Sequence, residues 1–390
     1  MSCRVDEVSH IDDELVAWLD ARAGEMADLV VALVAIDTEN PPGRGLHECG
    51  AALRDAMARL RLAPELIELG GDACIVRGGV GEGSRLVYFH GHFDVVPAQR
   101  RDQFRPQRRD GRITGRGTAD MKGGLVSMLY GAAAARELGL LDDTRIVLHC
   151  VCDEETGSAV GSGYLREAGL IDPSAFAMLT AEPTGGVVWN GCRGAITLRV
   201  DVAGREAHVG YANTGVNAFE HMLRVAQPLT ALAHELFARD SMLIVGGASQ
   251  SGANFNVVPG SAWFSVDRRF NPGEDLEAEV ARLTDTIERA AGDADVSVEV
   301  LQRAPSASTD PDHPAALALV ECVTEVEGAA PVVELCPGVL ETRWYAQLGI
   351  PAFAYGAGGL DVAHGPGEYI DEAAMRRCAA VYARYASTRP

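Results

Sequence analysis

The chain has 390 residues, of which 47% are hydrophobic and 6% aromatic, and its formal net charge is −21. This length and apolar content suit a globular protein with two properly buried cores and exclude a disordered chain. Negative charge of this size repels a phosphate backbone, and only the segment at residues 99–110 (QRRDQFRPQRRD) is locally basic. The composition therefore argues against nucleic acid as a partner.

The first 25 residues carry many acids and no apolar segment of the kind found in secretory leaders. Nowhere is an apolar stretch long enough to cross a bilayer. We therefore expect a soluble, cytoplasmic protein with no membrane partner. Nine cysteines are too sparse for a disulfide scaffold and would stay reduced there. We interpret Cys150 and Cys152 as buried packing, because no other close-spaced thiol accompanies them to make a soft-metal site.

Helical and strand patterns alternate along the first part of the chain. The segments in order are a helix at 14–36, a strand at 85–96 (RLVYFHGHFDVV), an Ala-rich helix at 121–140 and a buried strand at 144–155 (TRIVLHCVCDEE). Such alternation indicates an α/β fold in which helices flank a mostly parallel sheet. Ligand sites in these sheets gather at the carboxyl ends of strands, which is where HGHFD and DEET fall.

The pattern changes between residues 193 and 302, where strands alternate as if half exposed and antiparallel. The segments that carry this pattern are two strands, 196–204 and 261–270, and two helices, 219–237 and 274–292. We interpret 193–302 as an inserted α+β domain. The α/β pattern resumes after it, so residues 1–192 and 303–390 are expected to form one catalytic α/β domain.

Titratable side chains cluster at the ends of the expected strands. His90, His92 and Asp94 alternate and therefore share one strand face, where an apolar core would not accept them unless they were paired or ligated. Four further acidic or histidine-bearing stretches coincide with turn signals: GRGTADMKGG (115–124), DEETGS (153–158), AEPTGG (181–186) and AHGPGEYI (363–370). A mixed histidine and carboxylate set suits zinc or a similar divalent ion, and a shared carboxylate suits two ions about 3.5–4 Å apart.

Taken in order, GHFDVVP, GRGTADMKGG, DEETGS, AEPT and HGPGEYI closely resemble the motifs of a co-catalytic zinc family. Its members include aminoacylase, acetylornithine deacetylase, succinyl-diaminopimelate desuccinylase and carboxypeptidase G. The resemblance covers nearly the whole chain, including the inserted segment. It implies an enzyme with two Zn²⁺ per chain, for which Co²⁺ or Mn²⁺ can substitute. The reaction it implies is hydrolysis of the amide bond of an N-acyl amino acid or small peptide by a zinc-activated water.

The resemblance also implies a role for each motif residue. The implied metal ligands are His92, Asp120, Glu155, Glu182 and His364. Asp120 would bridge both ions and be followed by a cis peptide bond. Glu182 would complete the site of His92, and His364 would complete that of Glu155. Asp94 would hydrogen-bond the other ring nitrogen of His92, whereas His90 is interpreted as a structural histidine with an ordinary hydrogen bond.

Glu154 is expected to differ from its neighbour Glu155. Adjacent residues of an extended chain point in opposite directions, so the two cannot do the same job. The resemblance gives Glu155 to the metal and makes Glu154 the catalytic base. Glu154 would take a proton from the attacking water and pass it to the leaving amine.

The inserted segment carries three further candidates. REAHVGYANTGVNAFE (205–220) resembles a lid segment whose histidine reaches the partner's active site in a homodimer and stabilises the oxyanion, which makes His208 a catalytic candidate. The resemblance also implies that Asn256, in SGANFNVVPG, contacts the substrate and that Arg269, in DRRF, receives the substrate's carboxylate. Arg268 is the alternative, because only one of two adjacent strand residues can face the cleft.

The chain departs from many relatives at two places. Leu340 and Glu341 precede Arg343 where a Thr–Asp or Ser–Asp pair is common, and the lid reads HVGYANTG in place of a serine-rich stretch that contains proline. These changes concern the acyl pocket and leave the ligands intact. One alternative is a dipeptidase, carboxypeptidase or other amine-releasing hydrolase on the same site. Another, of a different class, is a catalytically silent protein that binds a metal or a small acid, although such a protein has no need of Glu154.

Overall fold

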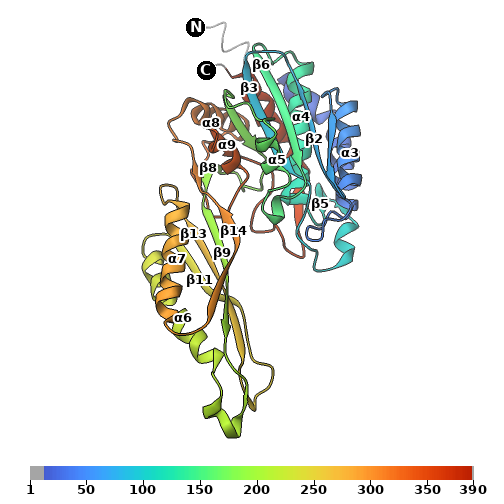
Figure 1. Cartoon of the computed structure of the whole chain (residues 1–390). Coiled ribbons are helices and arrows are strands. Elements are labelled where there is room, and N and C mark those ends of the chain that lie inside the picture. The colour runs from blue at the N-terminus through green and yellow to red at the C-terminus, as the bar shows by residue number, and fades with distance from the viewer. Residues whose placement is uncertain (1–12, 389–390) are drawn as a thin grey trace. The chain divides into compact units, whose positions relative to one another are not determined.

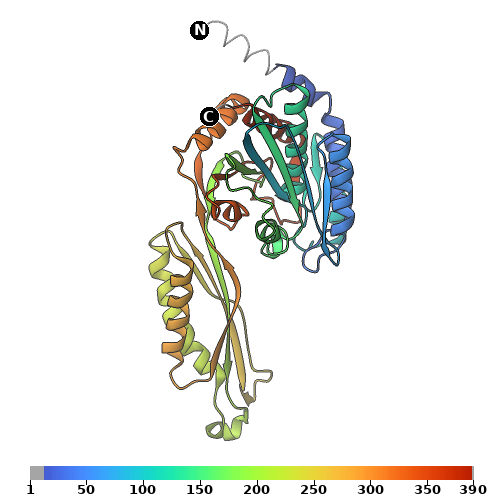
Figure 2. The same ribbon diagram turned by 45° about the horizontal axis from the view of Figure 1, so that its top comes forward.

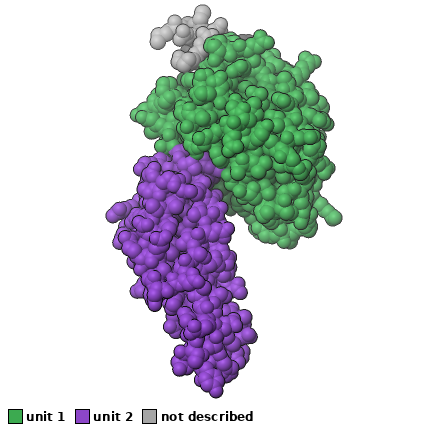
Figure 3. Space-filling view, viewed as in Figure 1, with its two compact units in different colours: residues 1–191, 308–335, 344–390 green, residues 192–307, 336–343 purple. Residues whose placement is uncertain are grey.

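The structure, a computed structural model, describes residues 13–388, so the first twelve residues of the acidic segment considered above lie outside it. The chain forms two compact units (Figure 3). Their ranges are 1–191, 308–335 and 344–390 for unit 1, and 192–307 and 336–343 for unit 2. None of the helices within residues 13–388 is long and apolar enough to cross a membrane.

Unit 1 is built on a nine-stranded sheet with the order β1-β2-β6-β3-β7-β17-β8-β15, in which β16 also pairs with β8. Figure 1 labels four of these strands, β2, β6, β3 and β8. The bounds are β1 (Glu65–Gly70), β2 (Ala73–Val80), β3 (Arg85–His92), β6 (Thr144–Val151), β7 (Ala177–Thr180), β8 (Val188–Cys192), β15 (Ala307–Ser308), β16 (Val333–Cys336) and β17 (Ala352–Ala354). The central strands β6, β3, β7 and β17 run parallel to one another, and β1, β2 and β8 pair with their neighbours in antiparallel fashion. All eight residues of β3 are buried, as expected of a strand in a parallel sheet that is covered on both faces. The predicted α/β sheet is confirmed.

Side chains of β3 alternate between two apolar cores. Val87 and Phe89 belong to the larger core, whereas Leu86 and Tyr88 belong to the other. The larger core is covered by α2 (Ala23–Ala35), α3 (Leu46–Arg59), α4 (Gly123–Glu137), α8 (Pro314–Glu327) and α10 (Glu372–Ser387), and the other by α5 (Ser162–Glu167) and α9 (Thr342–Ala346). The Ala-rich helix α4 lies so close to α10 that a Cβ on Gly131 would be 2.7 Å from the Ala379 carbonyl oxygen.

Short elements carry the motif loops of unit 1. They are the three-stranded sheet β18-β5-β4, with β4 (Gln107–Arg109), β5 (Arg112–Thr114) and β18 (Tyr369–Asp371), and the turns η1 (Arg101–Phe104), η2 (Thr118–Lys122) and η3 (Glu154–Thr156). Turn η2 follows β5 and contains Asp120, while η3 follows β6 and contains both adjacent glutamates. The acidic motifs thus lie where strands end.

Unit 2 is a four-stranded antiparallel sheet, β11-β13-β9-β14, with two helices on one face (Figures 1 and 2). Its elements are β9 (Gly194–Ala203), α6 (Ala218–Phe237), β11 (Met242–Ser251), β13 (Ser261–Phe270), α7 (Leu276–Ala291) and β14 (Val296–Ala304), together with the turn η4 (Val209–Thr214) and a two-stranded ribbon of β10 (Ala207–His208) and β12 (Val257–Val258). Both helices begin at a side-chain cap: Asn217 accepts from the Phe219 N–H, and Asp275 from the Ala278 N–H.

The division into units differs from the expected domains on the C-terminal side. Residues 303–307 and 336–343 belong to unit 2, although they were assigned to the catalytic domain. Residues 336–343 are far from Arg193 in the sequence but are hydrogen-bonded to its backbone. The Arg193 N–H donates to the carbonyls of Cys336 and Gly338 at 3.3 and 3.0 Å. The segment with the unusual Leu340–Glu341 pair is therefore part of unit 2.

Candidate metal centre

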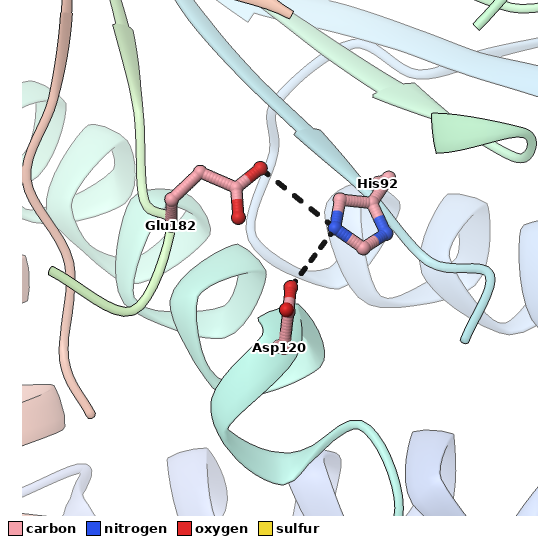
Figure 4. A group of neighbouring side chains, drawn as sticks. All are labelled: His92, Asp120 and Glu182. Atoms are coloured by element: carbon pink, nitrogen blue, oxygen red, sulfur yellow. Dashed lines mark hydrogen bonds and ion pairs between the residues drawn. The ribbon is translucent and has the colours of Figure 1, made fainter. Parts of the chain in front are cut away.

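The first candidate ligand group surrounds His92, the last residue of β3. His92 Nε2 lies 3.1 Å from Asp120 Oδ1 and 3.7 Å from Glu182 Oε1 (Figure 4). Its other nitrogen, Nδ1, lies 3.3 Å from Asp94 Oδ1 and 3.1 Å from the Asp94 carbonyl oxygen. Asp94 thus contacts the ring nitrogen that faces away from the other carboxylates, and this contact orients the ring.

The second group is centred on His364, in the loop before β18. Its Nε2 lies 3.2 Å from Asp120 Oδ2 and 3.3 Å from Glu155 Oε1. Asp120 therefore presents one carboxylate oxygen to each histidine. The backbone places it there through η2, and the peptide bond that follows it is cis, as implied.

Both groups fit a divalent cation. In each, three donor atoms lie within 4.8 Å of one another, with one histidine nitrogen and two carboxylate oxygens. Carboxylates that converge in a buried site repel one another, and a cation relieves that cost. Mixed nitrogen and oxygen donors suit zinc and similar ions. Because Asp120 is common to both groups, the arrangement fits two neighbouring ions.

The carboxylates shift the proton affinity of the two histidines. Burial alone would lower the pKa of His92, but hydrogen bonds to Asp120 and Asp94 prevail and hold it well above its usual range. Hydrogen bonds to Asp120 and then Glu155 raise the pKa of His364 to about 10. Burial would raise the pKa of Asp120, yet the two histidines hold it below its usual range. In the absence of metal, each group therefore holds a proton in the place of the cation, which binding must displace.

Asp94 also positions the loop that follows β6. The side chain is fully buried, and its Oδ1 and Oδ2 accept from the N–H groups of Glu154 and Glu155, each at 3.2 Å. Asn40 Nδ2 donates to Oδ2 at 3.1 Å. Glu155 turns into the second ligand group, whereas Glu154 belongs to neither group. One buried carboxylate thus fixes both a ligand ring and the backbone of the candidate base.

Two supporting residues were not predicted, although both lie in motifs noted in the sequence. Glu368 is buried, and its Oε1 accepts from the N–H groups of Ala119 and Asp120 at 3.0 and 3.1 Å, while Arg116 pairs with its Oε2 at 2.6 Å. Lys122 is equally buried and donates to two backbone carbonyls at the end of α2. The only sequence signal was a charged residue in each motif that had no assigned role.

The three candidates of unit 2 lie on its sheet and ribbon. His208 in β10 is exposed, and its Nδ1 accepts from the Gly210 N–H at 3.1 Å. Asn256 is also exposed. It lies beside His208, because its backbone carbonyl oxygen accepts a hydrogen bond from the N–H of Val209. Arg269 in β13 pairs with Asp267 at 2.8 and 3.1 Å. The ribbon therefore brings His208 and Asn256 together and leaves Arg269 on the main sheet.

The alternative residue Arg268 is not available to a substrate. Its side chain is fully buried and bonded to Glu274 and Glu279 at 2.6 and 2.8 Å. A different arginine, which sequence reasoning missed, is a better candidate than Arg268 for contact with a substrate. Arg193 is nearly buried just before β9, and its Nε and Nη1 have no hydrogen-bond partner among residues 13–388. Only its Nη2 is paired, with Asp240 at 3.1 Å.

Together, two histidine–carboxylate groups that share one carboxylate, at the strand ends of an α/β sheet, define a candidate two-metal hydrolase. Comparison with known proteins agrees. The family described as peptidase family M20/M25/M40 matches residues 88–388. Acetylornithine deacetylase of Myxococcus xanthus is 31% identical over 79% of this chain and 81% of its own length. Succinyl-diaminopimelate desuccinylase of Corynebacterium glutamicum is 26% identical over 92% and 96%.

Solved structures show the same fold at low sequence identity. The metallo-carboxypeptidase Sso-CP2 of Sulfolobus solfataricus is 16% identical with a TM-score of 0.80, and the match covers 93% of this chain and 98% of that one. Human carnosine dipeptidase 1, also 16% identical, has a TM-score of 0.74 and covers 96% and 98%. The chain belongs to peptidase family M20/M25/M40. It is a metal-dependent hydrolase of amide bonds, which confirms the resemblance carried by its five motifs.

Proposed function

We propose that the protein is a deacylase that removes the acyl group from an N-acyl amino acid with the help of two zinc ions. The observation that carries the proposal is the division of Asp120, one oxygen toward His92 and the other toward His364. The names of the acetylornithine deacetylase and desuccinylase relatives support the substrate class. Co²⁺ or Mn²⁺ would substitute for zinc, since all three accept nitrogen and oxygen ligands.

Glu154 would move the proton in this reaction. Two bound ions would polarise the amide carbonyl and lower the pKa of the attacking water. Glu154 takes the proton from that water and later gives it to the leaving amine, while Asp94 holds the Glu154 backbone through its N–H. The products are a carboxylate and a free amine, so one water is consumed for each bond broken.

His208 would support the negative charge that develops on the carbonyl oxygen. Because its Nδ1 accepts from the Gly210 N–H, the neutral ring carries its proton on Nε2 and can donate from there. Asn256, beside it on the ribbon, would add a polar contact to the substrate. Both side chains are exposed, which suits groups that must meet a substrate.

Arginine side chains of unit 2 would hold the carboxylate of the substrate. Arg193 is nearly buried, and its Nε and Nη1 have no hydrogen-bond partner among residues 13–388, so each N–H is available to donate to a carboxylate of the substrate. Arg269 is the register partner of Ala195, two residues from Arg193, and would be the second contact if it exchanged Asp267 for the substrate. Such pairing would favour an N-acyl amino acid over a neutral amide.

We also propose a cytoplasmic homodimer in which unit 2 is both lid and dimerisation domain. The edge strand β11 and the neighbouring helix α6 expose Ile244, Leu223 and Phe219, which a second copy would cover. His208 would then serve the partner's active site. The eight cysteines described by the structure are all free and buried, which supports a reducing compartment.

A substrate screen tests this function against the dipeptidase alternative. N-acetyl amino acids, N-succinyl amino acids and dipeptides are offered to the protein after chelation and after reloading with zinc, cobalt or manganese. The proposal predicts turnover of N-acyl amino acids only in the reloaded protein. Turnover of dipeptides alone would replace deacylation by peptidase activity. A metal-loaded protein inactive on every class would favour the silent binding protein.

A further inference from the structure

A buried polar cluster lies beneath the candidate metal centre, on the sheet face covered by α5 and α9. His90 and His149 are register partners on the parallel strands β3 and β6, and both are fully buried. Tyr345 of α9 and Ser162 of α5 are also fully buried and complete the cluster. Apolar side chains of the second core surround it. Polar groups in such a place are costly unless they are hydrogen-bonded.

The four side chains form one continuous chain of hydrogen bonds. The Tyr345 hydroxyl lies 2.8 Å from His149 Nδ1 and 3.0 Å from His90 Nδ1. The other nitrogen of His90, Nε2, lies 3.2 Å from the Ser162 hydroxyl. One tyrosine hydroxyl therefore joins two histidines of neighbouring strands, and the hydrogen bond between His90 and Ser162 joins them to α5.

The proton positions follow from this geometry. Burial, reinforced by His90 and Arg77, holds the pKa of His149 well below its usual range, so its ring is neutral. His149 Nε2 has no hydrogen-bond partner in the described part of the chain, and a buried acceptor without a partner is tolerated better than a donor. His149 therefore donates from Nδ1 to Tyr345. The tyrosine then donates to His90 Nδ1, and His90 donates from Nε2 to Ser162.

Ser162 connects this chain to the loop that carries Glu154 and Glu155. Ser162 is the first residue of α5, and the N–H groups of Val160 and Gly161 just before it donate to the Asp153 carboxylate at 2.6 and 2.7 Å. The Asp153 carboxylate thus ties the far end of the loop, at Val160 and Gly161, to the start of the loop. Asp94 binds the near end through two backbone N–H groups.

Both ends of the loop are therefore tied to the segment 90–94 that carries His92. His90 holds the far end through Ser162, and Asp94 holds the near end. We propose that His90 and Tyr345 are positioning residues, which set the relation between His92 and Glu155 and thereby the affinity of the centre for its metal. This inference rests on the proposed function, because it presupposes that these two side chains bind metal.

The chemistry of the cluster favours this role over simple filling of the core. Apolar side chains of similar volume would fill the same space without the cost of burying six polar atoms. A chain of side chains joined to one another by hydrogen bonds instead has one favoured geometry, which keeps the strands and helices it joins in fixed positions. Ligand residues of a metal site benefit from this, and loss of a supporting hydrogen bond typically weakens metal binding by 10–100-fold.

Tyr345→Phe tests the inference, because it removes the hydroxyl and keeps the ring. Tyr385→Phe is the matched control, since Tyr385 is also fully buried in unit 1 and donates one hydrogen bond, to the Ala315 carbonyl. Co²⁺ affinity is measured by competition with a chelator, together with the visible absorption of bound Co²⁺ and the melting temperature. We expect Co²⁺ to bind about tenfold more weakly to Tyr345→Phe, with an altered spectrum, and normally to Tyr385→Phe.

Equal Co²⁺ affinity and spectra in the two variants and the wild type, whatever their melting temperatures, would overturn the positioning role. A wild-type protein that bound no Co²⁺ would overturn the proposed function and this inference together. If Tyr345→Phe failed to fold, Ser162→Ala would replace it, because it breaks the same chain at its other end. A variant that carries both Tyr345→Phe and Ser162→Ala should bind Co²⁺ about as weakly as either single variant. Fully additive losses of Co²⁺ affinity would show that the two residues do not act through one chain of hydrogen bonds.

Discussion

The candidate metal centre of unit 1 and the ribbon of unit 2 are organised in opposite ways. In the metal centre, His92 and Asp94 are 1% and 0% exposed, and several partners hold each. On the ribbon, His208 is exposed, and in the segments beside it Tyr211 is 69% exposed and Phe255 is fully exposed. The candidate ligands of the first region all lie within one unit, whereas the second region presents candidate and apolar side chains to solvent.

The difference shows which parts of the site the fold can prepare in advance. Side chains at the ends of buried strands are fixed by the sheet and by each other before any ligand arrives. Exposed side chains on a two-stranded ribbon gain a fixed position only against another surface, and exposed aromatic groups are typical of a surface that becomes covered. We therefore expect changes in the centre to abolish function and changes in the ribbon to be rescued by a second chain.

The largest effect is expected from Asp120→Asn, which removes charge from both ligand groups at once. Turnover should fall at least about 10³-fold and both ions should be lost, because the shared carboxylate holds the two groups together. Asp110→Asn, an exposed residue of the same unit, is the control and should change neither. Metal content and turnover are measured on the same preparations. Retention of both ions would remove Asp120 from its bridging role.

Glu154→Ala should separate chemistry from metal binding. Turnover should fall at least about 10²-fold, the usual contribution of a general base, while both ions stay bound. The matched variant Glu155→Ala should lose metal, since that side chain lies 3.3 Å from His364. Loss of metal in Glu154→Ala and its retention in Glu155→Ala would mean that the two roles are reversed.

Mixing two inactive variants tests whether the ribbon acts on the partner. His208→Ala and Glu154→Ala are combined under conditions that allow subunit exchange. A shared site predicts recovery of up to about a quarter of wild-type activity, because random pairing makes half the dimers mixed and each mixed dimer has one intact site. If exchange is demonstrated and no activity returns, His208 serves its own chain or has no catalytic role.

The smallest effect concerns the stability of the buried region in acid. His149 is neutral in the folded state, and its pKa lies well below the usual value because of burial and then His90 and Arg77. Below about pH 6.5 the unfolded chain binds a proton at His149 that the folded chain does not, so stability falls as pH falls. The slope is about 1.4 kcal/mol per pH unit for one proton. Urea unfolding from pH 7 to pH 5 should show this extra slope in the wild type and not in His149→Gln. Parallel curves would contradict a neutral buried His149.

The sequence predicted most features of the central sheet and of the candidate site at its strand ends. The apolar runs that became β3 and β6 were recognised, and the five candidate ligands, one in each of five separate motifs, are the residues that the structure groups together. His90 was expected to be structural, and its bonds to Tyr345 and Ser162 agree. Cys150 was expected to be packed in the core, and it is fully buried.

Contacts between distant segments could not be predicted from local patterns. Arg116 and Glu368 are 252 residues apart, and nothing in either motif indicates the pair. Residues 336–343 belong to unit 2 because of backbone bonds to Arg193, which no periodicity reveals. The alternation of side chains along a strand predicted that only one of Arg268 and Arg269 could face a substrate. The burial that excludes Arg268 from substrate contact depends on the packing of α7, which the alternation does not reveal.

The metal content of the wild-type protein tests the central claim most directly. Elemental analysis is carried out on protein prepared without chelator, and again after dialysis against chelator and reloading with zinc. The two ligand groups that share Asp120 predict about two divalent ions per chain, with activity lost on chelation and restored on reloading. Protein that contains no bound metal, and whose activity is unaffected by the chelator, would contradict the assignment of the site.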